Sequence, residues 1–341
     1  MTVETDWAHE VEAYLHVLER GDRLAALRQV RKLRLEGHDV LNVVQRLLAP
    51  AQLRVGELWL RDCWSVGQEH AATVVSETII EWLAAERERQ TLSDAPATEL
   101  VVSCVEQEWH ALAALMVAEH LRAEGFAVSY LGANRSTLSL VRQIQDTGPS
   151  VVLLSCSLSA FLPLARRQIQ AVRDTGTPVV VGGAAFDAEG RRAATLGATG
   201  FATSVVGLAD LVRSMPPAVT PAPRLTHRGA EEALVLFGQR EAIANRVEQH
   251  LLTTLDLAGS ADTTRGNSWF RVLSEQLPLL VGSVAGALVC DDQQIVVHAL
   301  GWAQEVLTAR SAPASARATL VAGLRDALHD LPEASRLVAG L

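Results

Sequence analysis

The spacing of apolar residues predicts a helical first region. From residue 7 to residue 86, Leu, Val and Ala recur at helical spacing with polar residues between them. Turn-forming residues interrupt the pattern at Gly21-Asp22, Gly37 to Asp39 and Pro50. We therefore expect a bundle of about four or five short helices over residues 1–92.

From residue 99 the pattern changes to short aliphatic runs that alternate with helical segments. The predicted strands are ELVVSCV (99–105), FAVSYLG (126–132), SVVLLSCS (150–157), PVVVGGAAF (178–186) and TGFATSVV (199–206), and the predicted helices lie at 108–123, 136–146, 160–173 and 187–196. Strands and helices that alternate at this pitch form βαβ units around a parallel sheet. We expect a flavodoxin-like (Rossmann-like) parallel α/β domain over residues 97–213.

A proline-rich linker and further helical patterns follow. Residues 214–228, SMPPAVTPAPRLTHR, are typical of a linker. Helical patterns return at 229–256, 266–289, 293–310 and 313–340, with DDQQ at 291–294 as a turn and helix-start signal. The block NSWFRVLSEQLPLLVGSVAGALV is apolar nearly all round, which predicts a buried core or dimerisation helix. Residues 229–341 are therefore expected to form a third, all-α domain.

Composition narrows the classes of function. The net charge of −9 and the absence of a basic run argue against a nucleic-acid partner. The four cysteines are scattered without a CxxC pair, which favours a reducing, cytoplasmic compartment over a disulfide framework or a zinc site. The N-terminus has no signal-peptide pattern, and no apolar run was expected to reach the roughly 18 residues of a spanning helix. No membrane association is predicted.

A histidine at the end of the first predicted strand is the main candidate for chemistry. In an open parallel sheet, ligands bind outside the carboxyl ends of the strands, and His110 leaves the first strand at that edge. Glu108 could accept a hydrogen bond from the imidazole and set its tautomer, as the partners of metal-bound histidines do. Ser155 ends the third strand, and Gly182-Gly183 ends the fourth, where backbone can approach a ligand closely. The alternative for His110 is a helix-capping or solvated loop residue.

These residues resemble the cobalamin-binding domain family, whose pattern is Asp-x-His-x-x-Gly, then Ser-x-Leu, then Gly-Gly. The corresponding segments are EWHALA at 108–113, SCS at 155–157 and Gly-Gly at 182–183, so that Glu, Ala and Ser replace the family's Asp, last Gly and Leu. The resemblance implies that His110 is the axial ligand to cobalt, in place of the cofactor's own base, and that the nucleotide tail runs between the Ser and Gly-Gly segments. The cobalamin-binding residues that it implies are Glu108, Trp109, His110, Gly132, Ser155, Ser157, Ser159, Gly182, Gly183 and Ala202.

A second motif, LWLRDCWSVGQEHAATVV at 58–75, places Trp59 and Glu69-His70 on neighbouring predicted helices. An indole that faces a carboxylate suits a nucleoside, because the ring can stack and the carboxylate can bind the ribose hydroxyls. The alternative is core packing by Trp59 and Trp64, with Glu69-His70 in a solvated first turn. The motif resembles the Trp-then-Glu-His motif of CarH-type light-sensing repressors, which implies that Trp59, Glu69 and His70 cap 5′-deoxyadenosylcobalamin. That group's light-responsive histidine after the Trp is Leu60 here.

The C-terminal region completes a resemblance to the photocobilins, which join adenosylcobalamin to a C-terminal globin-like domain that holds a bilin, usually biliverdin. For the bilin propionates, the available cations are Arg240, Arg265 and Arg271. For the pyrrole rings, the candidate contacts are Trp269, His298 and Trp302, the last two one helical turn apart. Cys290 could form a thioether, although an apolar helix end more often holds an inert thiol.

We therefore expect a light-sensing, cytoplasmic binding protein rather than an enzyme. It would bind adenosylcobalamin and biliverdin, form a homodimer through apolar helical surfaces and act on an effector protein that the sequence does not identify. One alternative is a corrinoid methyl-shuttle protein of a methyltransferase system, which would need an upper face open to methyl donors. Another is a cobalamin-sensing regulatory module without a bilin, whose C-terminal helices dock a partner protein.

Overall fold

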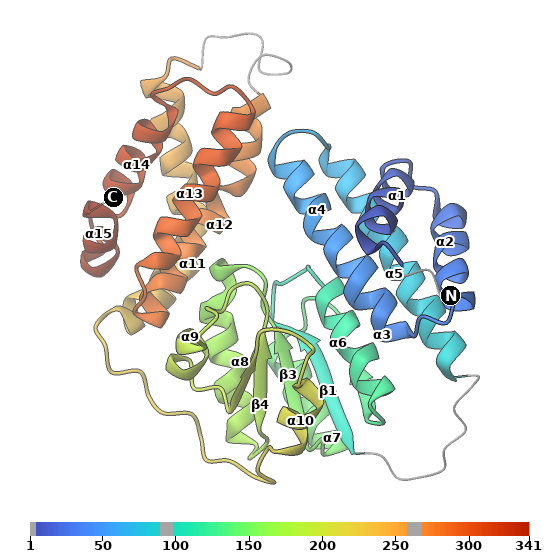
Figure 1. The fold of residues 1–341 in the computed structure, drawn as a ribbon. Coiled ribbons are helices and arrows are strands. Elements are labelled where there is room, and N and C mark those ends of the chain that lie inside the picture. The colour runs from blue at the N-terminus through green and yellow to red at the C-terminus, as the bar shows by residue number, and fades with distance from the viewer. Residues whose placement is uncertain (1–4, 89–97, 258–267, 341) are drawn as a thin grey trace. The chain divides into compact units, whose positions relative to one another are not determined.

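The computed structural model describes residues 5–88, 98–257 and 268–340 (Figure 1). It contains a helical N-terminal region, a parallel five-stranded α/β region and a helical C-terminal region, which confirms the predicted fold class. The described part of the chain forms two compact units. The N-terminal unit contains the residues up to 98 together with 112–128, and the C-terminal unit contains 99–111 and the residues from 129 onward.

The N-terminal unit consists mainly of helices, and aspartate side chains cap the first three of them. Its elements are α1 (Trp7–Glu19), α2 (Arg23–Leu35), α3 (Val40–Val43), the π-helical turn η1 (Val44–Leu48), α4 (Ala49–Leu60), α5 (Val66–Glu88) and α6 (Leu112–Ala123). The side chains of Asp6, Asp22 and Asp39 each accept a hydrogen bond from a first-turn amide of α1, α2 and α3, respectively. The predicted break at Pro50 is wrong. The chain stays helical from Val40 to Leu60, because the wide π-turn accommodates a residue that lacks the amide proton of an α-turn.

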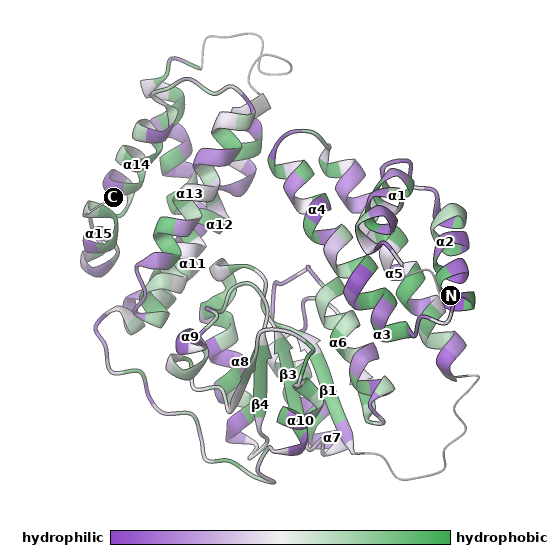
Figure 2. Cartoon of the chain, viewed as in Figure 1, coloured by the Kyte–Doolittle hydropathy of each residue, from purple (hydrophilic) through white to green (hydrophobic). Residues whose placement is uncertain are grey.

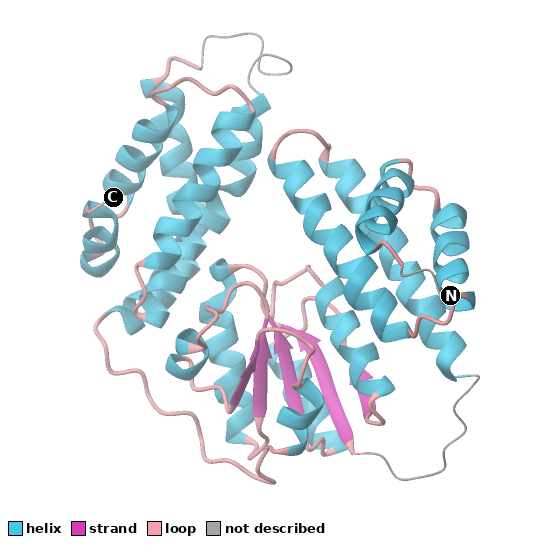
Figure 3. Ribbon diagram, in the orientation of Figure 1, coloured by secondary structure: helices cyan, strands magenta, loops and turns pink. Residues whose placement is uncertain are grey.

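The sheet has the strand order β2-β1-β3-β4-β5, and it is drawn in magenta in Figure 3. Its strands are β1 (Glu99–Cys104), β2 (Ala127–Tyr130), β3 (Val151–Ser155), β4 (Val179–Gly182) and β5 (Gly200–Ala202). Strands β1, β3 and β4 are hydrophobic along most of their length, as parallel strands with two buried faces must be (Figure 2). The strand order reverses between β1 and β3, and such a switch point is where ligands bind in open α/β sheets.

The parallel register places the last residues of four strands in one row. Cys104 pairs with Ser155, Ser155 with Gly182, and Gly182 with Ala202. The loops that follow these residues therefore leave the sheet from the same carboxyl edge. This edge includes the predicted cobalamin-binding residues Ser155, Gly182 and Ala202.

The connecting elements of the α/β region are α7 (Thr137–Thr147), the 3₁₀ turn η2 (Ser159–Phe161), α8 (Leu162–Asp174), α9 (Arg191–Thr195) and α10 (Leu208–Arg213). Helix α7 is as long as the pattern predicts, whereas two of the predicted helices are shorter. The helix predicted at 108–123 begins only at Leu112, because Gln107 has a positive φ of 66° and the side chain of Glu108 bonds within the loop. The helix predicted at 187–196 begins at Arg191, after Gly190 in the left-handed conformation.

Residues 216–226 contain neither helix nor strand and run along the α/β region. Arg166, which is buried, donates to the carbonyl oxygens of Leu196 and Pro223, and Arg173 donates to that of Thr220. Ala222 is also buried. These contacts fasten the segment to the domain that precedes it.

The C-terminal region consists of α11 (Gly229–Thr254), α12 (Ser268–Cys290), α13 (Gln294–Ala309), α14 (Ala316–Ala327) and α15 (Pro332–Ala339). The predicted stretch 313–340 is two helices, because Leu331 is extended before Pro332 and the proline begins the next helix. The expectation that no apolar segment is long enough to span a membrane is wrong for Trp269–Cys290, whose mean hydropathy is 1.6. This match rests on length and composition only, and 67% of its apolar window is buried, as predicted for a central helix.

Helix α12 joins the C-terminal helices to the α/β region in one hydrophobic core. It packs against α11, α13 and α15 and also against η2 and α8 (Figure 1). Two glycines one helical turn apart allow the close approach. A Cβ on Gly286 would overlap the carbonyl oxygen of Ser159, and one on Gly282 would lie 2.9 Å from Cβ of Ala160. The hydroxyls of Ser159 and Ser283 are 3.0 Å apart.

Candidate functional site

The loop that leaves β1 is held in place before it reaches His110. The amide of Val105 donates to the carbonyl oxygen of Ser155 (3.0 Å). The carboxylate of Glu106 accepts hydrogen bonds from the amide and hydroxyl of Thr137 and from Arg167. The loop therefore presents its next residues from a fixed backbone.

The carboxylate of Glu108 is the centre of the loop's hydrogen bonding. Its side chain is fully buried, and Oε2 accepts from the amides of Ser157 (2.8 Å) and Leu158 (3.0 Å). Oε1 lies 3.1 Å from the amide of His110 and 2.5 Å from its ring Nδ1. Burial alone would raise the pKa of Glu108, but the hydrogen bonds from His110 and Leu158 outweigh it and lower that pKa. An ionised carboxylate is only an acceptor, so Nδ1 of His110 carries the proton.

His110 lies at the carboxyl edge with 59% of its side chain exposed. With the proton on Nδ1, the imidazole has its lone pair on Nε2, which is the tautomer of many metal-bound histidines. The predicted hydrogen bond between Glu108 and His110 is thus present, whereas cobalt ligation stays a prediction. The described residues contain no cluster of three or more His, Cys, Asp or Glu able to hold a metal ion. A single oriented imidazole fits the axial position of a metal that a macrocycle already holds.

Other residues predicted to bind cobalamin lie at or beside the same edge. Gly132 follows β2 with a positive φ of 75°, and its carbonyl oxygen accepts from the amide of Cys104 (3.0 Å). Ser157 and Ser159 lie in the segment after β3. Trp109, beside His110, is 71% exposed.

The glycine pair after β4 has an explanation inside the protein. A Cβ on Gly182 would lie 2.9 Å from the carbonyl oxygen of Ala202, and one on Gly183 would overlap the backbone of Cys156. Gly183 also has a positive φ of 109°. The sequence prediction attributed both missing side chains to a ligand, but the close approach that requires them is made by neighbouring backbone.

The residues predicted to cap the adenosyl group belong to the N-terminal unit. Trp59 and Leu60 end α4, and Glu69 and His70 lie near the start of α5, as the motif predicts. Trp59 is half-buried, whereas Trp64 is buried in the core of this unit, as its alternative interpretation expected. The carboxylate of Glu69 lies 2.5 Å from Nδ1 of His70 and accepts from the hydroxyl of Thr73 (3.2 Å).

A cavity of about 330 Å³ lies between the loops after β3 and β4 and helices α12 and α13. Its volume falls in the range of about 300–1,000 Å³ that small-molecule sites occupy. The polar and aromatic residues that line it include Ser157, Ser159, Arg192, Ser283, His298 and Trp302. The structure thus brings two residues predicted to bind cobalamin, Ser157 and Ser159, to the same cavity as two predicted to bind a bilin, His298 and Trp302.

The remaining bilin candidates that the structure describes do not line this cavity. Trp269 is buried against Phe270, Arg271 is exposed, and Arg265 lies outside the described residues. Arg240 donates to Gln107, and Cys290 is a buried thiol whose pKa is raised by that burial, which disfavours thioether formation.

Among the polar residues that line the cavity, sequence reasoning missed Arg192, Gln276 and Ser283. The spacing of Gly282 and Gly286, four residues apart on one helix, was the available signal that α12 approaches another backbone closely.

Comparisons with known proteins match two segments of the chain to B12-binding family models. Residues 98–212 match a family model described as a B12-binding domain, and residues 10–84 match a second model with the same description. None of the curated proteins compared with the chain matches it significantly.

Solved structures extend the comparison to the fold. A monomethylamine corrinoid protein from Methanosarcina barkeri has 14% sequence identity and a TM-score of 0.52, with 61% of this chain and 99% of that one covered. A cobalamin-binding protein from Desulfitobacterium hafniense DCB-2 has 19% sequence identity and a TM-score of 0.33, and the match covers 60% of this chain and 97% of that one. A methanol:cobalamin methyltransferase complex from M. barkeri has 14% sequence identity and a TM-score of 0.32, and the match covers 62% of this chain and 82% of that one. The similarity to the first of these supports the corrinoid-protein fold, and together with the family models it shows that this protein carries a B12-binding α/β domain, preceded by a helical region that also matches a B12-binding family.

Proposed function

We propose that this protein is a photoreceptor that binds adenosylcobalamin through His110 and a bilin in the cavity beside α12 and α13. The observation that carries the cobalamin part is the buried Glu108 carboxylate, which orients an exposed imidazole at the edge of a B12-binding domain. We also propose that the protein is a binding protein rather than an enzyme, that it is cytoplasmic and that it acts on a separate effector.

The chain's own residues supply the orientation that such a ligand needs. Glu108 is held by the amides of Ser157 and Leu158, so it can hold the proton on Nδ1 of His110 without moving. When bound, adenosylcobalamin would supply a cobalt–carbon bond that light can cleave. The imidazole would bind the metal through Nε2 and keep the cofactor's own base displaced.

Support for the adenosyl form comes from α4 and α5. Trp59 offers an aromatic face that is only half-buried, and Glu69 offers a carboxylate whose direction Thr73 constrains. A nucleoside can stack on the first and donate its ribose hydroxyls to the second. A methyl group offers neither interaction, so we favour the adenosyl ligand over the methyl-shuttle alternative.

Support for a second chromophore comes from the cavity. Trp302 and several aliphatic side chains offer apolar surface, while His298, Arg192 and three serines offer polar contacts. Small-molecule sites have this composition. Because Ser157 and Ser159 belong to its wall, a ligand there would contact the segment whose amides hold Glu108.

The test of the photoreceptor is the absorption spectrum of the full-length protein loaded with adenosylcobalamin, recorded in darkness and after green light. We expect a spectral change on illumination and stronger binding of adenosylcobalamin than of methylcobalamin. Protein loaded with cyanocobalamin, which has no cobalt–carbon bond to an alkyl group, is the control. An unchanged spectrum together with a preference for methylcobalamin would contradict the proposal and favour the methyl carrier.

The test of the second chromophore is titration with biliverdin, followed in the red region of the spectrum. We expect Trp302→Ala to weaken biliverdin binding by about tenfold or more, because stacked aromatic contacts and buried apolar area are lost. The control is His329→Ala, which replaces an exposed histidine at the end of α14 outside the cavity. Equal biliverdin affinity in both variants would place the bilin elsewhere or exclude it.

A further inference from the structure

We propose that Arg240, on α11 of the C-terminal region, is a positioning residue for His110. Its guanidinium donates a hydrogen bond from Nη2 to Oε1 of Gln107 (2.9 Å), three residues before the histidine. Sequence reasoning assigned Arg240 to a bilin propionate, but in the structure its guanidinium donates to Gln107, in the loop after β1. The inference rests on the proposed cobalt ligation, since it concerns what holds the ligand in place.

The backbone of Gln107 has a conformation that contacts with its surroundings must stabilise. Its backbone is in the left-handed region (φ 66°), which a residue with a Cβ adopts only when its surroundings hold it there. Its amide donates to Oδ1 of Asn134 (2.9 Å), and the amide of Asn134 donates to the carbonyl oxygen of Glu108 (2.8 Å). Hydrogen bonds within the α/β region therefore hold the backbone of Gln107. Arg240, on a C-terminal helix, holds its side chain.

Arg240 is itself held in one conformation. Nη1 donates to the carbonyl oxygen of Phe237 (3.0 Å), and the guanidinium lies 4.3 Å from the centre of the Phe237 ring. The carboxylate of Glu241 is 3.8 Å from Nη2, and the arginine side chain is only 20% exposed. A planar cation stacked and hydrogen-bonded in this way loses little further freedom when it binds Gln107. It can therefore act as a rigid support.

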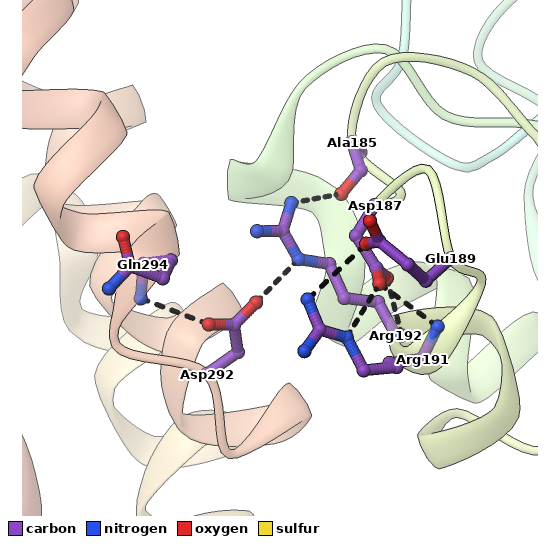
Figure 4. Close-up of polar contacts among 7 residues, drawn as sticks. All are labelled: Ala185, Asp187, Glu189, Arg191, Arg192, Asp292 and Gln294. Carbon is purple, nitrogen blue, oxygen red and sulfur yellow. Dashed lines mark hydrogen bonds and ion pairs between the residues drawn. The ribbon is translucent and has the colours of Figure 1, made fainter.

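The same helical region also contacts the α/β region away from His110, which provides a matched control. Nε of Arg192 donates to Asp292, in the turn between α12 and α13, and Nη1 donates to the carbonyl oxygen of Ala185 (Figure 4). Asp187 accepts from the amide of Arg192 (Figure 4). Asp292→Asn weakens this ion pair and leaves the loop after β1 untouched. A general loosening of the C-terminal helices can thus be separated from a specific effect on His110.

The experiment compares full-length Arg240→Ala, Gln107→Ala, the double variant and Asp292→Asn. In the cofactor-free protein, we expect Arg240→Ala to accelerate amide hydrogen exchange in residues 105–111 by about threefold to tenfold, with the same acceleration in Gln107→Ala and no further gain in the double variant. Asp292→Asn should leave exchange in this loop unchanged. Arg240→Lys, which keeps the charge and one donor, should restore part of the protection.

A second measurement reports on the axial ligand itself. With cob(II)inamide as probe, a corrinoid that lacks the cofactor's own base, the nitrogen splitting in the electron paramagnetic resonance spectrum should broaden in Arg240→Ala and stay sharp in Asp292→Asn. Unchanged exchange and unchanged splitting in Arg240→Ala and Gln107→Ala would overturn the inference. If His110→Ala also left the splitting intact, the proposed cobalt ligation would fail instead. Should Arg240→Ala not fold, Gln107→Ala tests the same hydrogen bond from the other side.

Discussion

His110→Ala is expected to weaken cobalamin binding by about 100-fold or more, because even the loss of a partner that orients a metal-bound histidine costs roughly 10–100-fold in affinity. The substitution removes the imidazole and leaves the buried Glu108 carboxylate without the ring that it orients, though still bonded to the amides of Ser157 and Leu158. The affinity for adenosylcobalamin, measured by absorption titration, should fall, and the axial nitrogen splitting of bound cob(II)inamide, which has no base of its own, should disappear.

Two further variants separate ligation from general disturbance of the loop. Glu108→Gln keeps the shape of the side chain but replaces an acceptor oxygen with a donor amide, so the two donors that bond to that oxygen lose their acceptor. We expect a smaller loss of affinity, with the nitrogen splitting still present. His329→Ala serves as the distant control. Wild-type affinity in His110→Ala would show that the imidazole does not hold the metal.

Gly286→Ala is expected to destabilise the C-terminal unit by about 2–3 kcal/mol, which is the typical cost of overpacking a core. The new Cβ would overlap the carbonyl oxygen of Ser159, so α12 and η2 must separate. Alanine is otherwise more favourable than glycine in a helix by about 1 kcal/mol. A loss of stability in Gly286→Ala would therefore show that the overlap outweighs this preference. Because the segment that moves also carries the amides that bind Glu108, cobalamin affinity should decrease as well.

Gly301→Ala on α13 is the matched control, since a Cβ there would meet nothing within 4 Å. It should be neutral or stabilise by up to about 1 kcal/mol. The protein has more than one compact unit, so the free energy of opening is best measured by amide hydrogen exchange in α12 rather than from one global transition. Equal protection of α12 in the two variants would show that the contact between α12 and η2 is not tight.

The position of each candidate at the sheet edge follows from local pattern alone. Parallel strands end at one edge, so a histidine after β1, a serine after β3 and glycines after β4 must lie near one another once the alternation of strands and helices is recognised. The hydrogen bond between Glu108 and His110 is also local, because the two residues are only two positions apart in the chain. These features needed no knowledge of long-range packing.

What the sequence by itself determined about this protein is therefore the order of its helical and α/β regions, the parallel sheet and the Glu108–His110 pair, since each depends on periodicity or on neighbours in the chain. Only the tertiary structure decided that α12 packs on η2, that Ser157 and His298 line one cavity and that Arg240 bonds to Gln107. Hydrophobic periodicity shows that a helix has a face to bury, but it does not show which surface covers that face. The partner of an arginine on such a helix depends on that packing and on nothing in its own neighbourhood of the sequence.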